Sequence, residues 1–146
     1  MSFPAYPEYK DSGVEWLGQV PISWSIKPAR RLFEQRRDDA LETDEQLSAT
    51  QKYGVLPQSL FMSLEDQKVV LALSGLKNFK HIETGDFVIS LRSFQGGIER
   101  SVYSGCVSPA YTVLRSSVTI SSTYWAYLFK SAPYIDALQT MTDGIR

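Results

Sequence analysis

The sequence predicts an α+β protein with a curled, largely antiparallel β-sheet and peripheral helices. Strand patterns occupy the middle of the chain, and apolar residues at helical spacing follow near its end. Prolines interrupt the first 27 residues and exclude a regular helix there. With 146 residues, 43% of them hydrophobic, the chain can build one packed core. We therefore expect a single domain over 1–146, composed of an extended N-terminal arm (1–27) and an α/β body (28–146).

The arm leads into a short helix. A turn is expected over 18–21, and Pro28 can open a helix because a proline at the first helical position loses no hydrogen bond. The anchors expected to pin the arm are Trp16, Leu17 and Trp24. The apolar face of the helix contains Ala29, Leu32 and Phe33. Residues 36–39 form an Arg-Arg-Asp-Asp run that we interpret as a solvated surface, and residues 38–48 are polar and predict a loop.

Strands are predicted in the middle of the chain. Residues 69–73 form a short apolar run, and residues 86–92 alternate between apolar positions on one face and mixed positions on the other. Gly96 and Gly97 predict a tight reversal, after which 98–103 would return as the partner strand. Residues 110–115 have the β-branched and aromatic content of a further strand.

The end of the chain predicts two helices. Ser121 or Ser122 can cap a helix through residues 124–129, in which Trp125 is expected to be a packing anchor. Pro133 opens a second helix, and Gly144 suits its end. The apolar positions of the second helix are Ile135, Leu138 and Met141.

Charge is unevenly distributed, although the formal net charge is only −1. Residues 1–67 carry 7 basic and 11 acidic side chains, whereas residues 68–115 carry 6 basic and 3 acidic ones. A local basic patch is sufficient for phosphate contact, because salt screens charges over about 10 Å. The alternative interpretation of this segment is a solvated sheet edge with spare lysines.

Enzyme motifs are missing from the sequence. It has no glycine-rich cofactor loop after a strand and no Gly-Lys-Ser/Thr triplet, which argues against a DNA methyltransferase and an ATP-driven motor. Asp86 and Glu99 lack the Glu-x-Lys pattern of a metal-dependent nuclease, and Asp86 is interpreted as a turn residue. Cys106 and His81 are a weak nucleophile–base pair, so we interpret Cys106 as a small loop or core residue and His81 as a surface residue. We expect no catalysis, cofactor or metal.

The sequence also indicates where the protein works. A single cysteine excludes an internal disulfide and a cysteine-rich zinc site, which favours a reducing compartment. Residues 1–10 lack the apolar run of a signal peptide, and no stretch approaches the roughly 18 apolar residues of a membrane span. We expect a cytoplasmic protein without a membrane partner.

Four stretches carry a family resemblance. They are residues 9–18, with Val20, Pro21 and Trp24 following, residues 85–99, residues 108–114 and residues 143–146. In order and spacing these stretches resemble the specificity subunits of bacterial type I restriction-modification systems, and in particular their target-recognition domains. The resemblance covers about a third of the chain and extends over nearly all of it.

The resemblance implies a non-catalytic, DNA-binding role. Such subunits contain two target-recognition domains separated by long helices, and each domain reads one half of a split sequence in double-stranded DNA. Modification subunits carry the methyl transfer, restriction subunits add translocation and cleavage, and S-adenosylmethionine, ATP and magnesium belong to those chains. This sequence ends at Arg146, before any spacer helix or second recognition domain, so we expect a truncated product, an isolated half or an excised domain. The alternative is a truncated subunit that acts by pairing with another half or with a modification subunit.

Candidate DNA contacts follow from the residue types and the resemblance. Family members read different sequences, so Arg92 and Arg100, in or beside a shared stretch, are assigned to phosphate contact or scaffold. Base reading is expected in 44–80, where the resemblance is absent. The candidates there are Gln51, Lys52, Tyr53, Gln58, Lys77, Asn78 and Lys80. The loop after the alternating strand adds Gln95 as a base contact, with Gly96 and Gly97 allowing close backbone approach. Each candidate is alternatively an ordinary surface residue.

Overall fold

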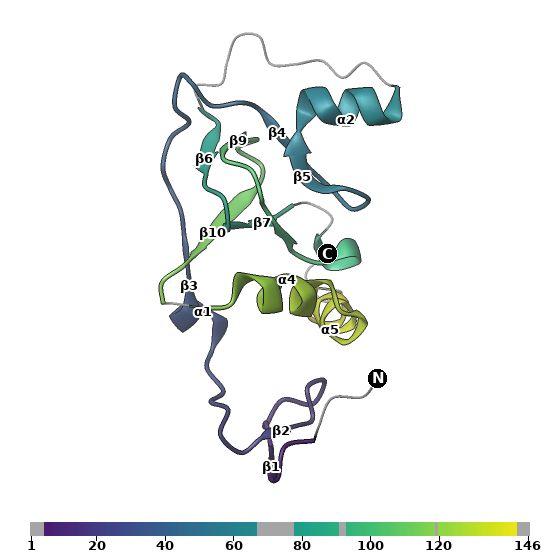
Figure 1. Ribbon diagram of the computed structural model, residues 1–146. Helices are drawn as coiled ribbons and strands as arrows, with labels where there is room; N and C mark the ends of the chain where they lie inside the picture. Colours follow the sequence, from purple (N-terminus) through teal and green to yellow (C-terminus); the bar gives the residue numbers. More distant parts are fainter. Residues whose placement is uncertain (1–4, 67–77, 91–92, 119, 143–146) are drawn as a thin grey trace.

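The computed structural model describes residues 5–66, 78–90, 93–118 and 120–142, and its elements form layers above and below a central sheet (Figure 1). The predicted α+β class is confirmed, and all pairs between named strands are antiparallel. The elements are β1 (Tyr9–Asp11), β2 (Gln19–Pro21), α1 (Ala29–Leu32), β3 (Phe33–Gln35), β4 (Leu47–Thr50), β5 (Gly54–Pro57), α2 (Gln58–Glu65), β6 (Lys80–Ile82), β7 (Phe87–Ile89), α3 (Ser93–Gly96), β8 (Glu99–Arg100), β9 (Gly105–Val107), β10 (Thr112–Ser116), α4 (Ser122–Lys130) and α5 (Ala132–Thr142).

The central sheet has the strand order β3-β10-β7-β8, and both of its faces are covered. Val88 of β7 lies opposite Val113 of β10, and Phe87 lies opposite Leu114. Successive side chains of a strand point to opposite faces. The two valines therefore enter an aliphatic cluster on one face, while Phe87 and Leu114 enter an aromatic cluster on the other.

The aliphatic cluster is covered by two further two-stranded sheets, β4-β5 and β6-β9, with α2 beside β5. The residues that these sheets contribute are Leu47, Val55, Ile82 and Val107. Isolated bridges from Gln46 to Cys106 and from Val55 to Ser101 connect the two sheets to their neighbours. The predicted single curled sheet is thus divided into small sheets that share one core.

The aromatic cluster is covered by α4 and α5. Phe33, Phe87 and Phe129 pack with ring centroids 5.1–5.7 Å apart, and Trp125 lies 5.3 Å from both Phe33 and Phe129. The predicted cap is confirmed, because the Ser121 side chain accepts a hydrogen bond from the backbone N–H of Tyr124. Aromatic pairs at such distances add roughly 0.5–1.5 kcal/mol each beyond their burial.

The N-terminal arm is a two-stranded hairpin rather than a plain extended segment. β1 and β2 pair through Lys10 and Val20, and the chain turns within 12–18 instead of the expected 18–21. Trp16 packs against Tyr134 of α5 at 5.6 Å, and Trp24 packs against Tyr124 of α4 at 6.1 Å. These contacts hold the arm beneath the helices, as the anchor prediction expected.

Two boundary predictions were wrong. Phe33, expected in a helix, begins β3 because the backbone there pairs with β10. Gly96 and Gly97 do not form a tight hairpin turn: residues 93–96 make one helical turn, closed by a hydrogen bond from Gly97 N–H to the Ser93 carbonyl. The return strand is consequently shorter than the predicted 98–103. The predicted strand 69–73, the end of the alternating strand at 91–92, and the helix end at Gly144 lie outside the described residues.

A buried ion pair connects β3 to β7. The Arg36 guanidinium donates from Nε to Asp86 Oδ2 at 2.6 Å and from Nη2 to Oδ1 at 3.3 Å. Asp86 Oδ2 also accepts from the backbone N–H of Glu83, which confirms the turn role predicted for Asp86. Arg36 is therefore not part of a solvated run, because its side chain is only 14% exposed.

Gly97 has a packing role that can be tested. It has a φ of +83°, and a Cβ at this position would overlap the carbonyl oxygen of Phe129 at the end of α4. Gly97→Ala should lower the free energy of unfolding by about 1–3 kcal/mol more than Gly85→Ala, because overpacking adds to the cost of positive φ. Gly85 is the matched control, since its φ is +95° and nothing lies near its Cβ position. Urea unfolding measures both, and equal losses would contradict the packing role.

The Arg36–Asp86 pair gives a second prediction. Asp86→Asn should cost roughly 3 kcal/mol of unfolding free energy, since it leaves the guanidinium largely buried without its main carboxylate. Asp38→Asn removes the exposed partner of the same guanidinium and should cost under about 1 kcal/mol. Urea unfolding of the two variants gives the comparison. A similar loss in both would show that burial does not distinguish the two contacts.

Candidate nucleic-acid interface

A polar groove lies between the β4–β5 turn and the β8 edge of the central sheet. Its volume is about 450 Å³. Six of its eight lining residues carry hydrogen-bonding side chains, and such groups can fix the orientation of a ligand. The lining residues are Ala49, Thr50, Gln51, Lys52, Ser90, Gly97, Glu99 and Tyr111.

The β4–β5 turn is built to present its tip. Thr50 Oγ1 donates to the Gly54 carbonyl at 2.9 Å and accepts from the Tyr53 N–H at 3.0 Å. Gly54 has a φ of +72°, a conformation that glycine adopts readily and that lets the chain turn back into β5. Gln51 and Lys52 are consequently exposed at the tip of the turn.

Lys52 and Tyr53 lie together at this tip. The Lys52 ammonium is 5.0 Å from the centroid of the Tyr53 ring and 3.3 Å from Glu65 Oε1 of α2. The Tyr53 ring packs edge-on against Phe61 of α2 at 6.3 Å. An exposed amide, a cation and an aromatic ring thus occupy one turn. These are side-chain types that can contact DNA.

The two glycines of the candidate set are occupied by the protein itself. A Cβ on Gly96 would come within 2.7 Å of the Gln51 side chain, so α3 and the β4–β5 turn meet closely there. Gly97 is buried against the end of α4. We expected both glycines to let DNA approach the backbone closely. Their small size instead allows close contacts within the fold, with Gln51 and with the end of α4.

Glu99 is the acidic group of the groove. It is 9% exposed, and its Oε1 accepts a hydrogen bond from the Lys130 ammonium of α4. Burial raises the pKa of Glu99 above its usual value, and the pairing with Lys130 offsets only part of that effect. From the sequence, Glu99 was considered only as a nuclease carboxylate, and its ion pair with Lys130 was not predicted.

The other candidate contacts are spread over the molecule. Gln95 is exposed on α3, and Asn78 is exposed before β6. Lys80 donates to the Tyr111 carbonyl at 2.5 Å, and Arg100 donates to Thr123 Oγ1 at 3.3 Å, so each cation is held by a different element. Gln58, expected as a base reader, is buried at the start of α2. Lys77 and Arg92 lie outside the described residues.

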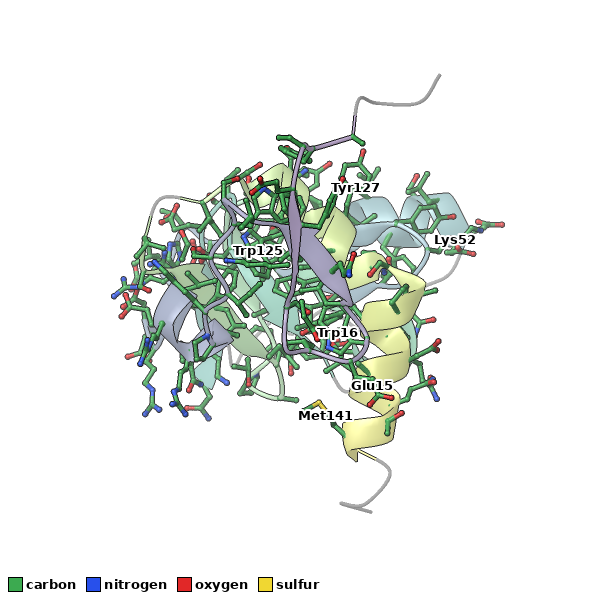
Figure 2. All side chains as sticks on the ribbon, turned by 90° about the horizontal axis from the view of Figure 1, so that it is seen from below. Glu15, Trp16, Lys52, Trp125, Tyr127 and Met141 are labelled. Atoms are coloured by element: carbon green, nitrogen blue, oxygen red, sulfur yellow. The ribbon has the colours of Figure 1, made fainter. Side chains whose placement is uncertain are left out.

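Several cations of the described residues are engaged within the fold. Several are paired with carboxylates: Arg36 with Asp86, Arg115 with Glu34, Lys52 with Glu65 and Lys130 with Glu99. A second exposed basic region lies along α1 and β3, at the opposite edge of the central sheet from β8. Figure 2 shows nitrogen-ended side chains along this side of the molecule. Its residues are Lys27, Arg30, Arg31 and Arg37, and the prediction of DNA contacts did not include them.

Cys106 and His81 do not form a catalytic pair. They face each other across β9 and β6, but Cys106 is fully buried, and desolvation, helped by Asp44, raises the pKa of its thiol to about 11. A nucleophile needs the thiolate. Cys106 is thus a core residue, as expected, whereas the prediction of a surface position for His81 was wrong, because His81 is 8% exposed.

His81 is held by two carboxylates. Its Nδ1 lies 2.7 Å from Asp44 Oδ2, and its Nε2 lies 2.6 Å from Glu83 Oε1. Desolvation by itself would lower the pKa of His81, but the hydrogen bonds to Asp44 and Glu83 outweigh it and raise the pKa. In the described part of the chain, no group of three or more histidine, cysteine or acidic side chains is arranged to hold a metal ion.

Comparisons with known proteins found no matching family model, no similar curated protein and no similar solved structure. None of the helices in the described residues combines the length and the apolar character needed to cross a bilayer.

The environment of His81 predicts a pH-dependent stability. A raised folded-state pKa contributes stability that is complete below the unfolded pKa of about 6.5 and is lost as the pH rises through the folded value. Unfolding free energy measured in urea should therefore fall as the pH rises above about 6.5. His81→Gln should flatten this dependence. The groups facing the ring are Asp44, Glu83 and Cys106, with Arg36 acting on Glu83. An unchanged slope in His81→Gln would contradict the assignment.

Proposed function

We propose that this chain is a DNA target-recognition domain of a type I restriction-modification specificity subunit. It reads one half of a bipartite target in double-stranded DNA and directs modification and restriction subunits in the cytoplasm. The observation that carries the proposal is that the shared and the variable parts of the sequence occupy different parts of the fold. The described parts of the stretches that resemble the family form the scaffold, and a segment outside the resemblance forms the exposed polar tip beside the groove.

The resembling stretches are structural. Residues 85–99 run through β7 and α3 into β8, and residues 108–114 enter β10, so together they supply three of the four central strands. Residues 9–18 form the first strand and turn of the arm, which Trp16 attaches to α5. A shared scaffold of this kind supports a domain whose members differ in the sequence that they read.

The reading surface is the tip of the β4–β5 turn. Gln51 offers an amide that can pair with adenine through two hydrogen bonds, and Lys52 offers a cation for phosphate or guanine. Tyr53 adds an aromatic surface beside them. A good two-bond contact is worth about 1–3 kcal/mol of discrimination between bases. α2 supports the turn from behind through Phe61, which fixes where these side chains point.

Electrostatics set the conditions for binding. Because several cations are paired within the fold, few are left to neutralise phosphates on the groove side. Binding should accordingly be weak, with a shallow salt dependence that reflects the small number of phosphate contacts. The chain itself performs no chemistry in this proposal. Methyl transfer, ATP-driven translocation and cleavage belong to the partner subunits.

Selection from a pool of duplexes with a randomised centre tests the proposal. At low salt the chain should enrich a short motif, and raising the salt should weaken binding along a linear plot of log affinity against log salt. Binding without any enriched sequence would contradict sequence recognition. A failure to bind DNA even at low salt would contradict the proposal as a whole.

Two charge-neutralising variants locate the reading surface. Lys52→Gln should weaken DNA binding and reduce the salt slope by about 1, because one phosphate contact is lost. Arg30→Gln is the matched control, since it removes one exposed charge from α1, across the molecule from Lys52 (Figure 2). Fluorescence anisotropy with labelled duplexes measures both. If Arg30→Gln has the larger effect, the α1–β3 side is the interface instead.

A further inference from the structure

One carboxylate oxygen that faces the groove has no hydrogen-bond partner among the described residues. Glu99 is buried, and its Oε1 is bound by Lys130, but within the described part of the chain its Oε2 has no hydrogen-bond partner. Gly54 lies over this oxygen, since a Cβ on Gly54 would be 3.6 Å from it. Among the described residues, every side-chain nitrogen or oxygen atom that is shielded from solvent has a hydrogen-bond partner. Oε2 therefore reaches the open space of the groove that Glu99 lines.

We propose that the groove binds an unstacked nucleobase through the amino group at C6 of adenine or at C4 of cytosine, with Glu99 Oε2 as the acceptor. This inference rests on the proposed function and names the kind of base that the domain takes. A carboxylate oxygen is the natural acceptor for the amino group of cytosine or adenine, whereas the matching position of thymine or uracil is a carbonyl oxygen that cannot donate.

The size and lining of the groove fit such a ligand. A volume of about 450 Å³ falls within the range of small-molecule sites and is sufficient for one base. Tyr111 lines the groove and offers a ring for stacking, which is worth several-fold in affinity for an unstacked base. Gln51, at the rim, can add hydrogen bonds to the same base edge.

Charge favours a neutral donor over a cation. The Lys130 ammonium already neutralises Glu99, and the Lys52 ammonium at the mouth of the groove is paired with Glu65. A lysine or arginine side chain from a partner protein would therefore find no unpaired carboxylate among these groups. A neutral base with a phosphate attached would instead have its donor at Glu99 and its anion near Lys52. The charge arrangement thus selects a nucleotide over a basic peptide.

Nucleoside titrations of the full chain test the proposal directly. Binding of adenosine, cytidine, uridine and thymidine is followed by backbone amide chemical shifts of the groove residues. Adenosine and cytidine should bind roughly tenfold or more tightly than the other two, because an unmet acceptor penalises a carbonyl. Equal binding of all four, or no binding at millimolar concentration, would overturn the proposal.

A second arm identifies the source of the base. Labelled duplexes with one unpaired adenine are compared with duplexes that have one unpaired thymine in the same position. A preference for the unpaired adenine supports recognition of a base displaced from DNA, for which unstacking is already complete. Discrimination among nucleosides alone would assign the groove to a free nucleoside or nucleotide instead.

The variant Glu99→Gln predicts a switch in preference. Lys130 requires an acceptor and should bind the amide oxygen, which leaves the amide NH₂ where Oε2 was. The groove should then favour uridine and thymidine. Glu15→Gln is the matched control, as it makes the same change at an exposed site in the arm. A general loss of binding without a switch would contradict the acceptor role. If Glu99→Gln fails to fold, the wild-type nucleoside ranking decides alone.

The two proposals fail in different ways. A motif enriched from duplexes without nucleoside discrimination would overturn the groove and leave DNA recognition intact. Nucleoside discrimination without any enriched motif would overturn sequence recognition in duplex DNA.

Discussion

Phe87 and Val88 are neighbours in β7, and both are completely shielded from solvent, one in the aromatic cluster and one in the aliphatic cluster. This two-sided burial constrains the rest of the molecule. It requires α4 and α5 on one face of the central sheet and the two-stranded sheets β4-β5 and β6-β9 on the other. With both faces covered, binding surfaces are left to the turns and edges, where the β4–β5 tip and the groove are found.

Much of the fold was predictable because local patterns and packing agree. The alternation at Phe87 to Ile89 predicted opposite faces, and Ser121 predicted the start of α4. Phe33 was wrongly placed in a helix, because its spacing from Ala29 fits a helical turn although its backbone pairs with β10. Neither the β4–β5 hairpin nor α2 was predicted, although Gly54 and Pro57 mark their boundaries.

The candidate site was predictable only as residue types. Gln51, Lys52 and Tyr53 do lie together at an exposed tip, because they are consecutive in one turn. The ion pairs themselves could not be predicted, since they join residues distant in the chain. Lys130 and Glu99 are 31 residues apart, and Arg36 and Asp86 are 50 apart. A count of charges along the sequence cannot reveal which of them neutralise one another.

The complete burial of Cys106 gives the protein an internal reporter. It is the single thiol of the chain, and it lies in β9, within the layer of small two-stranded sheets that covers the aliphatic cluster. A thiol reagent can reach it only when that layer separates from the central sheet, so the alkylation rate measures how often the layer opens. Occupants of the neighbouring groove that tighten the layer will slow that reaction, which makes binding visible without any label on the ligand.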